Sequence, residues 1–64
     1  MNRTVKETMR MLYDINYIDP IIIKKSNCEE IEVLHFVVPE ELENKIVMAS
    51  YVNTNGRLLL RIES

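Results

Sequence analysis

The chain has 64 residues, 47% of them hydrophobic, and its eight Lys or Arg against ten Asp or Glu give a formal charge of −2. This length allows one domain with a small core. The hydrophobic fraction is too high for a disordered chain, and no apolar run approaches the roughly 20 residues of a membrane helix. Cys28 is the only cysteine, and no secretory signal is evident. We therefore expect one soluble domain over residues 1–64, in the cytoplasm.

The charges are unevenly distributed along the chain. Up to residue 28 there are five cations and three acids, whereas from residue 29 onward there are seven acids and three cations. One interpretation is a bipolar surface that orients a partner or a second copy of the chain. The alternative is that these charges only keep the surface solvated.

Residues 4–17 have the pattern of an amphipathic helix. Thr4 and Glu7 stand at the spacing of a capping box, in which the Thr hydroxyl and the Glu carboxylate each accept a backbone N–H of the other residue. Apolar side chains follow at helical spacing, and further ones widen the apolar surface beyond a single stripe. Asp19-Pro20 predicts the end of the helical region, because the residue before proline is driven out of the helical conformation.

The middle of the chain predicts two strands and a short helical turn. The β-branched run 20–25 is typical of a first strand, and a polar connection leads to a second strand over 31–38. Both faces of the second strand are mostly apolar toward its end, which favours a central strand covered on both sides. Pro39 and the acids that follow it predict a helical turn over 39–43.

The segment Asn53-Thr54-Asn55-Gly56 predicts a hairpin between the runs 46–52 and 57–62, with a type I turn whose last residue, the only glycine, has a positive φ. A bulge after the turn sets the register. The predicted pairs are Val52 with Leu58, Tyr51 with Leu59, Ser50 with Leu60, Ala49 with Arg61 and Met48 with Ile62. The predicted core face is Met48, Ser50, Val52, Leu58, Leu60 and Ile62, and the opposite face is Val47, Ala49, Tyr51, Leu59, Arg61 and Glu63.

These elements predict an α+β fold, with an N-terminal helix packed on a four-stranded antiparallel sheet in the order helix, strand, strand, short turn or helix, strand, strand. The sheet is either open or curled toward a small barrel. More apolar surface is present than one helix and one sheet face require, so we expect a second copy to cover part of it. In the alternative, the sheet curls and buries these residues within one chain.

The sequence contains no recognisable catalytic set, so we expect no enzymatic activity. Cys28 and His35 are the only candidates for a nucleophile and a base, on either side of one predicted hairpin. One Cys with one His falls short of a structural zinc site, and a single glycine cannot form a phosphate-binding loop. We therefore expect no cofactor, no metal and no small-molecule substrate.

Two functions remain. The first is a non-enzymatic protein–protein interaction module, a small regulator, adaptor or inhibitor that acts as a homodimer without membrane contact. Its expected contact residues are Met11, Tyr13, Tyr17, Leu34, Phe36 and Tyr51. The alternative is a nucleic-acid-binding transcriptional regulator with a basic helix face, since three of its cations stand three and four residues apart. Its expected contact residues are Arg3, Lys6, Arg10, Lys24 and Lys25.

Overall fold

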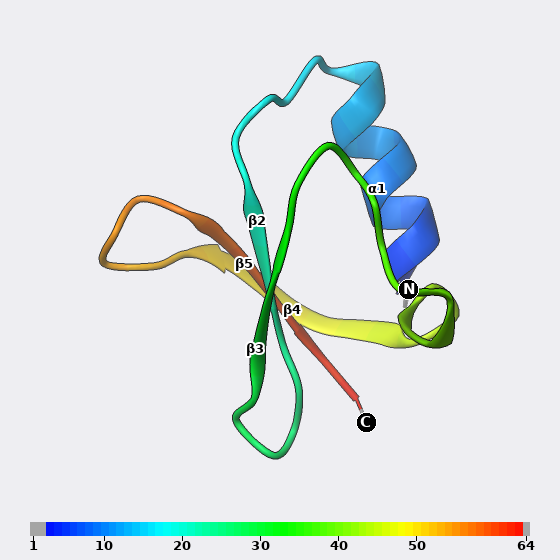
Figure 1. Ribbon diagram of the computed structural model, residues 1–64, viewed down its shortest axis with the longest axis vertical. Helices are drawn as coiled ribbons and strands as arrows, with labels where there is room; N and C mark the ends of the chain where they lie inside the picture. Colours follow the sequence, from blue (N-terminus) through cyan, green and yellow to red (C-terminus); the bar gives the residue numbers. More distant parts are fainter. Residues whose placement is uncertain (1–2, 64) are drawn as a thin grey trace.

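The computed structural model describes residues 3–63 and has one helix packed on a five-stranded mixed sheet (Figure 1). The elements in chain order are β1 (Arg3–Thr4), α1 (Val5–Asp14), β2 (Ile21–Lys24), β3 (Glu30–Val33), the 3-10 helix η1 (Glu40–Leu42), β4 (Ile46–Val52) and β5 (Leu58–Ile62). The predicted α+β class and the N-terminal helix on a sheet are confirmed. Residues 1, 2 and 64 of the predicted domain lie outside the described residues.

The strand order of the sheet is β1-β4-β5-β2-β3. Neighbouring strands are antiparallel except β2 and β5, which are parallel. The prediction of four antiparallel strands was therefore wrong in two respects. The two hairpins join through their inner strands, and Arg3–Thr4 adds a short fifth strand against β4. The sheet is open, with β1 at one edge and β3 at the other, so it does not form a barrel, and β3 is an edge strand where a central one was expected.

The capping box at the start of α1 is present as predicted. The Thr4 hydroxyl oxygen accepts the Glu7 N–H at 3.2 Å, and Glu7 Oε1 accepts the Thr4 N–H at 3.0 Å. The Thr4 hydroxyl also donates to Glu7 Oε1, at 3.0 Å. The backbone N–H and the hydroxyl of Thr4 both favour the ionised carboxylate, so they lower the pKa of Glu7 below its usual value of 4.5. The helix ends at Asp14, earlier than predicted, because Asn16 adopts a left-handed conformation with φ of 59°.

The β2–β3 hairpin turns through three residues. The Cys28 N–H donates to the Lys25 carbonyl at 3.0 Å, and Cys28 has φ of 70°. A type I turn followed by a left-handed residue is a common three-residue hairpin loop, in which glycine usually takes that last position. Lys25 Nζ and Glu29 Oε1 form an ion pair at 3.0 Å across the loop. The polar connection predicted between these strands is therefore a tight turn.

The β4–β5 hairpin has the predicted turn. The Gly56 N–H donates to the Asn53 carbonyl at 3.0 Å, and Gly56 has φ of 78°. The four predicted pairs from Val52 with Leu58 to Ala49 with Arg61 are confirmed. The fifth was wrong, because a β-bulge at Met48 makes Val47 the partner of Ile62.

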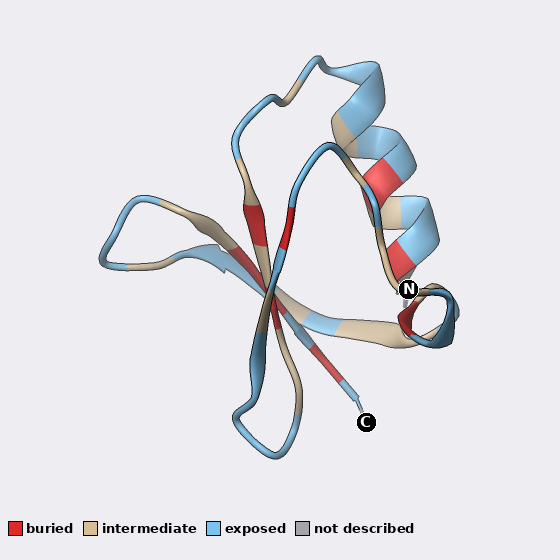
Figure 2. Ribbon diagram, in the orientation of Figure 1, coloured by how far each residue is buried: buried red, intermediate tan, exposed pale blue. Residues whose placement is uncertain are grey.

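The core lies between α1 and the sheet, near the point where the strands cross in the view of Figure 2. It contains Val5, Met9, Ile21, Ile23, Val33, Leu42, Leu60 and Ile62. Leu60 and Ile62 were correctly predicted to be core, but Met48, Ser50 and Val52 are exposed. The distal part of the β4–β5 hairpin extends away from α1, so the helix does not cover it (Figure 1). On the other face Leu59 is only 4% exposed, so part of the expected excess apolar surface is already buried within one chain.

Candidate functional site: an apolar patch around a left-handed turn

The segment predicted as the distal half of a strand is a tight turn over residues 34–37. Its two central residues have positive φ, 53° at His35 and 62° at Phe36, and the Val37 N–H donates to the Leu34 carbonyl at 3.1 Å. Two consecutive left-handed residues define a type I′ turn, which strongly prefers Asn-Gly. The prediction of a strand to residue 38 was wrong because the turn forms here from a histidine and a phenylalanine, which give no turn signal.

The turn places Phe36 against the last full turn of α1. The rings of Phe36 and Tyr13 meet edge to face, with centroids 5.9 Å apart and planes at 78°. This geometry is the favourable one for two aromatic rings, because the positive edge of one ring meets the negative face of the other. The contact connects the turn to the helix and forms one wall of a cavity.

The cavity has a volume of about 390 Å³ and lies between the end of α1, the following loop and the turn. Its lining is mostly aromatic and aliphatic: Tyr13, Tyr17, Ile18, Asp19, Ile21, Val33, His35 and Phe36. Such a cavity falls within the lower range of sizes at which proteins hold a ligand or the side chain of a partner. Asp19 is the only carboxylic acid in its lining and His35 the only imidazole.

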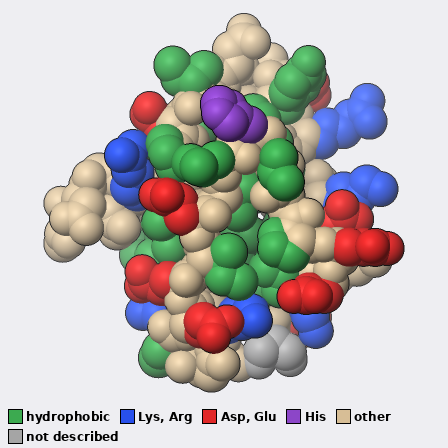
Figure 3. Space-filling view, viewed as in Figure 1, with side chains coloured by type: hydrophobic (Ala, Val, Ile, Leu, Met, Phe, Trp, Pro, Cys, Tyr) green, Lys and Arg blue, Asp and Glu red, His purple; other side chains and the backbone are tan. Residues whose placement is uncertain are grey.

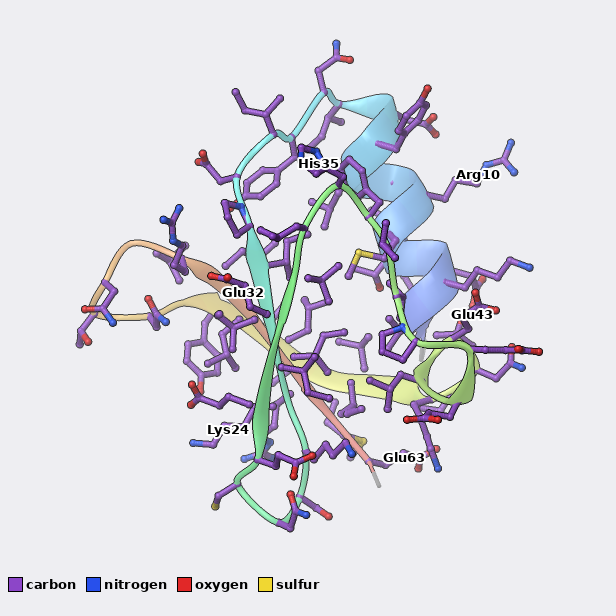
Figure 4. The ribbon with its side chains drawn as sticks, in the orientation of Figure 1. Arg10, Lys24, Glu32, His35, Glu43 and Glu63 are labelled. Atoms are coloured by element: carbon purple, nitrogen blue, oxygen red, sulfur yellow. The ribbon has the colours of Figure 1, made fainter. Side chains whose placement is uncertain are left out.

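Apolar side chains around the cavity are exposed to solvent. Tyr13 is 68% exposed, Ile18 88% and Val37 74%. We call the surface formed by Tyr13, Tyr17, Ile18, Leu34, His35, Phe36 and Val37 the turn patch. In Figure 3 the histidine lies among apolar side chains at one end of the molecule, and Figure 4 identifies it as His35, above the crossing of the strands. Large apolar residues gathered at one exposed site are a feature of interaction surfaces.

Four of the six predicted contact residues belong to the turn patch: Tyr13, Tyr17, Leu34 and Phe36. Met11 lies on the other flank of α1, where Arg3 Nη1 contacts its sulfur and Met48 lies nearby. Tyr51 lies on β4 and lines a separate hollow of about 420 Å³ on another part of the sheet. Ile18 and Val37 belong to the turn patch but were not predicted as contact residues. Ile18 stands just before the Asp19-Pro20 helix stop, where an apolar residue has no helix face to bury it.

The cations predicted to bind nucleic acid do not form one surface. Lys6 and Arg10 are exposed on α1, whereas Lys24 and Lys25 lie at the end of β2, and Figure 4 shows Arg10 and Lys24 on opposite sides of the molecule. Lys25 is paired with Glu29. The basic residues are thus divided between two distant places, and neither is the concentrated basic patch typical of nucleic-acid binding.

The two residues considered for nucleophilic chemistry are far apart. Cys28 lies in the turn before β3 and His35 in the turn after it. A four-residue strand at about 3.3 Å per residue separates them by more than 10 Å, beyond hydrogen-bond reach. Among residues 3–63 the structure has no group of three or more Cys, His, Asp or Glu placed to hold a metal ion.

Comparison of the chain with protein-family models, curated proteins and solved structures gives no match. Within the described part of the chain, α1 is too short to cross a membrane, and no other helix is long and apolar enough to do so. The function is therefore inferred from the residues of the turn patch and their geometry.

Proposed function

We propose that this chain is a non-enzymatic protein–protein interaction module, a small homodimeric regulator, adaptor or inhibitor, and that the turn patch binds its partner protein. The observation that carries the proposal is the exposure of apolar side chains around a cavity that a strained turn helps to line. An isolated exposed apolar residue needs no explanation, but a cluster of them around an aromatic cavity does.

The turn is costly to the fold. A left-handed conformation costs a residue with a side chain about 1–2 kcal/mol, so His35 and Phe36 together cost about 2–4 kcal/mol. Domains are stable by only about 5–15 kcal/mol in total. Residues in strained conformations cluster at functional sites, where the surrounding structure holds them. We infer that the turn is retained because it places the Phe36 ring at the cavity wall and leaves its first and last residues, Leu34 and Val37, exposed.

A selection of random 12-residue peptides displayed on phage tests this proposal. Peptides enriched on the folded protein are titrated into the ¹⁵N-labelled protein, and we expect the largest amide shifts at residues 13–18 and 34–37. Ile18→Ser removes an exposed apolar side chain at the cavity and is expected to weaken binding about tenfold or more, since burial of an isoleucine contributes about 1.5–3 kcal/mol.

Ile15→Ser is the matched control. Ile15 is 69% exposed and three residues before Ile18, but it does not line the cavity. The same chemical change there should leave peptide affinity unaltered. Shifts centred on another surface, or equal losses for the two variants, would contradict the assignment of the turn patch.

The alternative function is tested on the same protein with random-sequence DNA and RNA duplexes and single strands. An apolar interface should be nearly insensitive to salt, whereas nucleic-acid binding weakens steeply as salt rises because counterions are released. Tight binding to an oligonucleotide with a steep salt dependence, reduced by Lys6→Glu or Arg10→Glu, would favour the nucleic-acid regulator over the interaction module.

A further inference from the structure

The outer edge of β4 is covered by another strand only at its start. β1 pairs with Ile46 and Val47, and among residues 3–63 no strand pairs with the outer edge of β4 beyond that point. The segment from Ala49 to Val52 therefore has β5 on one side and no strand of the described residues on the other. An uncovered edge of this kind presents backbone donors and acceptors to any chain that can pair with it.

The hydrogen-bond alternation of the hairpin identifies which backbone groups are free. The Asn53 N–H donates to the Arg57 carbonyl at 2.8 Å, so this pair is a hydrogen-bonded one. In an antiparallel ladder such pairs alternate with pairs whose backbone groups face away from each other. Tyr51 with Leu59 is then hydrogen-bonded, whereas Ser50 and Val52 direct their N–H and C=O groups outward.

The side chains of this edge carry no charge. From Val47 to Asn53 there is no Asp, Glu, Lys or Arg, and Met48, Tyr51 and Val52 are 58%, 46% and 66% exposed. The opposite edge of the sheet differs, because β3 carries the exposed acids Glu30 and Glu32. Charged side chains protect an edge from pairing with a copy of itself, since like charges would face each other. The side chains of β3 supply this protection, and those of the free part of β4 do not.

We propose that the free part of β4 pairs with β4 of a second copy, so that two open sheets join into one continuous sheet in a symmetric dimer. This inference rests on the homodimer of the proposed function and names its interface. A twofold axis at Tyr51 pairs Ser50 with Val52 of the second copy, and Val52 with its Ser50. That register uses the outward backbone groups of both residues in both chains, for four hydrogen bonds. Registers centred on Ser50 or on Val52 leave some of these groups unpaired.

The same register places the two copies of Tyr51 directly opposite each other. Both side chains lie on the face of the sheet that α1 does not cover, next to Leu59. Facing residues of such a pair have Cα atoms about 4.5 Å apart, close enough for side-chain contact. The pairing ends toward Val47, where β1 occupies the edge. A dimer interface of this kind is isologous, because the same strand segment contributes from both copies.

Sedimentation equilibrium of the full chain from about 1 µM to 1 mM tests the dimer, with Ser50→Pro as the diagnostic variant. Proline removes the outward N–H of Ser50, which makes no bond to β5, so the hairpin within each chain keeps its ladder. We expect the wild-type chain to dimerise and Ser50→Pro to raise the dissociation constant at least tenfold. A second variant, Ser50→Lys, places a charge on the edge and should also raise the dissociation constant. It covers the case in which the proline itself perturbs the strand. A monomeric wild-type chain at 1 mM, or dimers that both variants leave intact, would overturn the proposal.

Cross-linking tests the register. In a Cys28→Ser background, which removes the exposed native thiol, Tyr51→Cys should oxidise to a covalent dimer, because facing Cα atoms about 4.5 Å apart lie within the range of disulfides. Val52→Cys is the matched control. Its copies lie diagonally across the axis, about 7–8 Å apart, and should not cross-link. Equal cross-linking of the two variants would refute the register centred on Tyr51.

The outcomes for this interface and for the turn patch are separable. Ser50→Pro should weaken the dimer at least tenfold and leave peptide binding at residues 13–18 and 34–37 unchanged, because the turn patch lies elsewhere on the molecule. Ile18→Ser should do the reverse. A monomeric chain would therefore not contradict partner binding at the turn patch, and an absence of peptide binding would not contradict the dimer.

Discussion

Replacement of His35 by glycine should stabilise the protein. His35 is exposed and has φ of 53°, a conformation that costs a residue with a Cβ about 1–2 kcal/mol. Glycine adopts it freely, but its greater freedom in the unfolded chain offsets about 0.5–1 kcal/mol of the gain. The net effect of His35→Gly is then an increase of about 0.5–1 kcal/mol in the free energy of unfolding. Little packing is lost, because the imidazole lies at the surface.

Thermal unfolding followed by circular dichroism measures this effect. For a domain of this size 1 kcal/mol shifts Tm by about 4–8 °C, so we expect a rise of roughly 2–8 °C for His35→Gly. Val37→Gly is the matched control, since Val37 is also exposed and belongs to the same turn but does not have a positive φ. At position 37 glycine only raises the conformational entropy of the unfolded chain, so Tm should fall by about as much as it rises for His35→Gly.

The two substitutions thus differ in sign, although both replace an exposed side chain of one turn by hydrogen. A fall in Tm for His35→Gly as large as that for Val37→Gly would show that residue 35 is not held in a strained left-handed conformation. The turn would then cost the fold less than proposed, and its strain would no longer support a binding role for the turn patch.

Four further changes test other parts of the fold. Thr4→Ala removes the helix cap and should lower the free energy of unfolding by about 1 kcal/mol in urea denaturation. The pKa of Glu7 is lower in the folded chain, so its ionised carboxylate contributes to the free energy of unfolding. This contribution is complete above the usual pKa of 4.5 and is lost as the pH falls through the lower pKa of the folded chain. Glu7→Gln should therefore make the free energy of unfolding less dependent on pH at acid pH. Gly56→Ala adds a Cβ that meets no atom within 4 Å, so its cost should be only the backbone term of about 1 kcal/mol, measured by thermal unfolding. Ile23→Ala leaves a cavity at a site that is 0% exposed and should lower the free energy of unfolding by about 2–5 kcal/mol, measured by urea denaturation.

The parts of the fold that depend on local chemistry were predictable from the sequence. The capping box needs only Thr4 and Glu7 at the right spacing, and the β4–β5 turn needs only Asn53 and Gly56. In each case the residues that form the feature are those whose side chains or φ preferences define it. The order of the strands is a different matter, because the parallel pairing of β2 with β5 is decided by how two hairpins pack, and no short segment encodes it.

The candidate site was only partly predictable, and the reason is the scarcity of glycine. The chain has one glycine, and among residues 3–63 four further left-handed positions are occupied by Asn16, Cys28, His35 and Phe36, of which only Asn16 is a residue type that turn prediction expects there. Turn prediction depends on Gly and Asn at such positions, and the alternation of apolar residues through Val37 is then read as a strand. Tyr13, Tyr17 and Phe36 were predicted as contact residues from the excess of apolar surface over what a small core needs, and the structure places all three in the lining of one cavity. Their convergence could not be derived, because it depends on a turn that the other contacts of the fold impose against the preferences of its own residues. The turn thus has an unfavourable local conformation, and it positions aromatic side chains that remain partly exposed. Such strain beside exposed aromatic side chains is typical of a binding site rather than of a hydrophobic core, and it supports the proposed function.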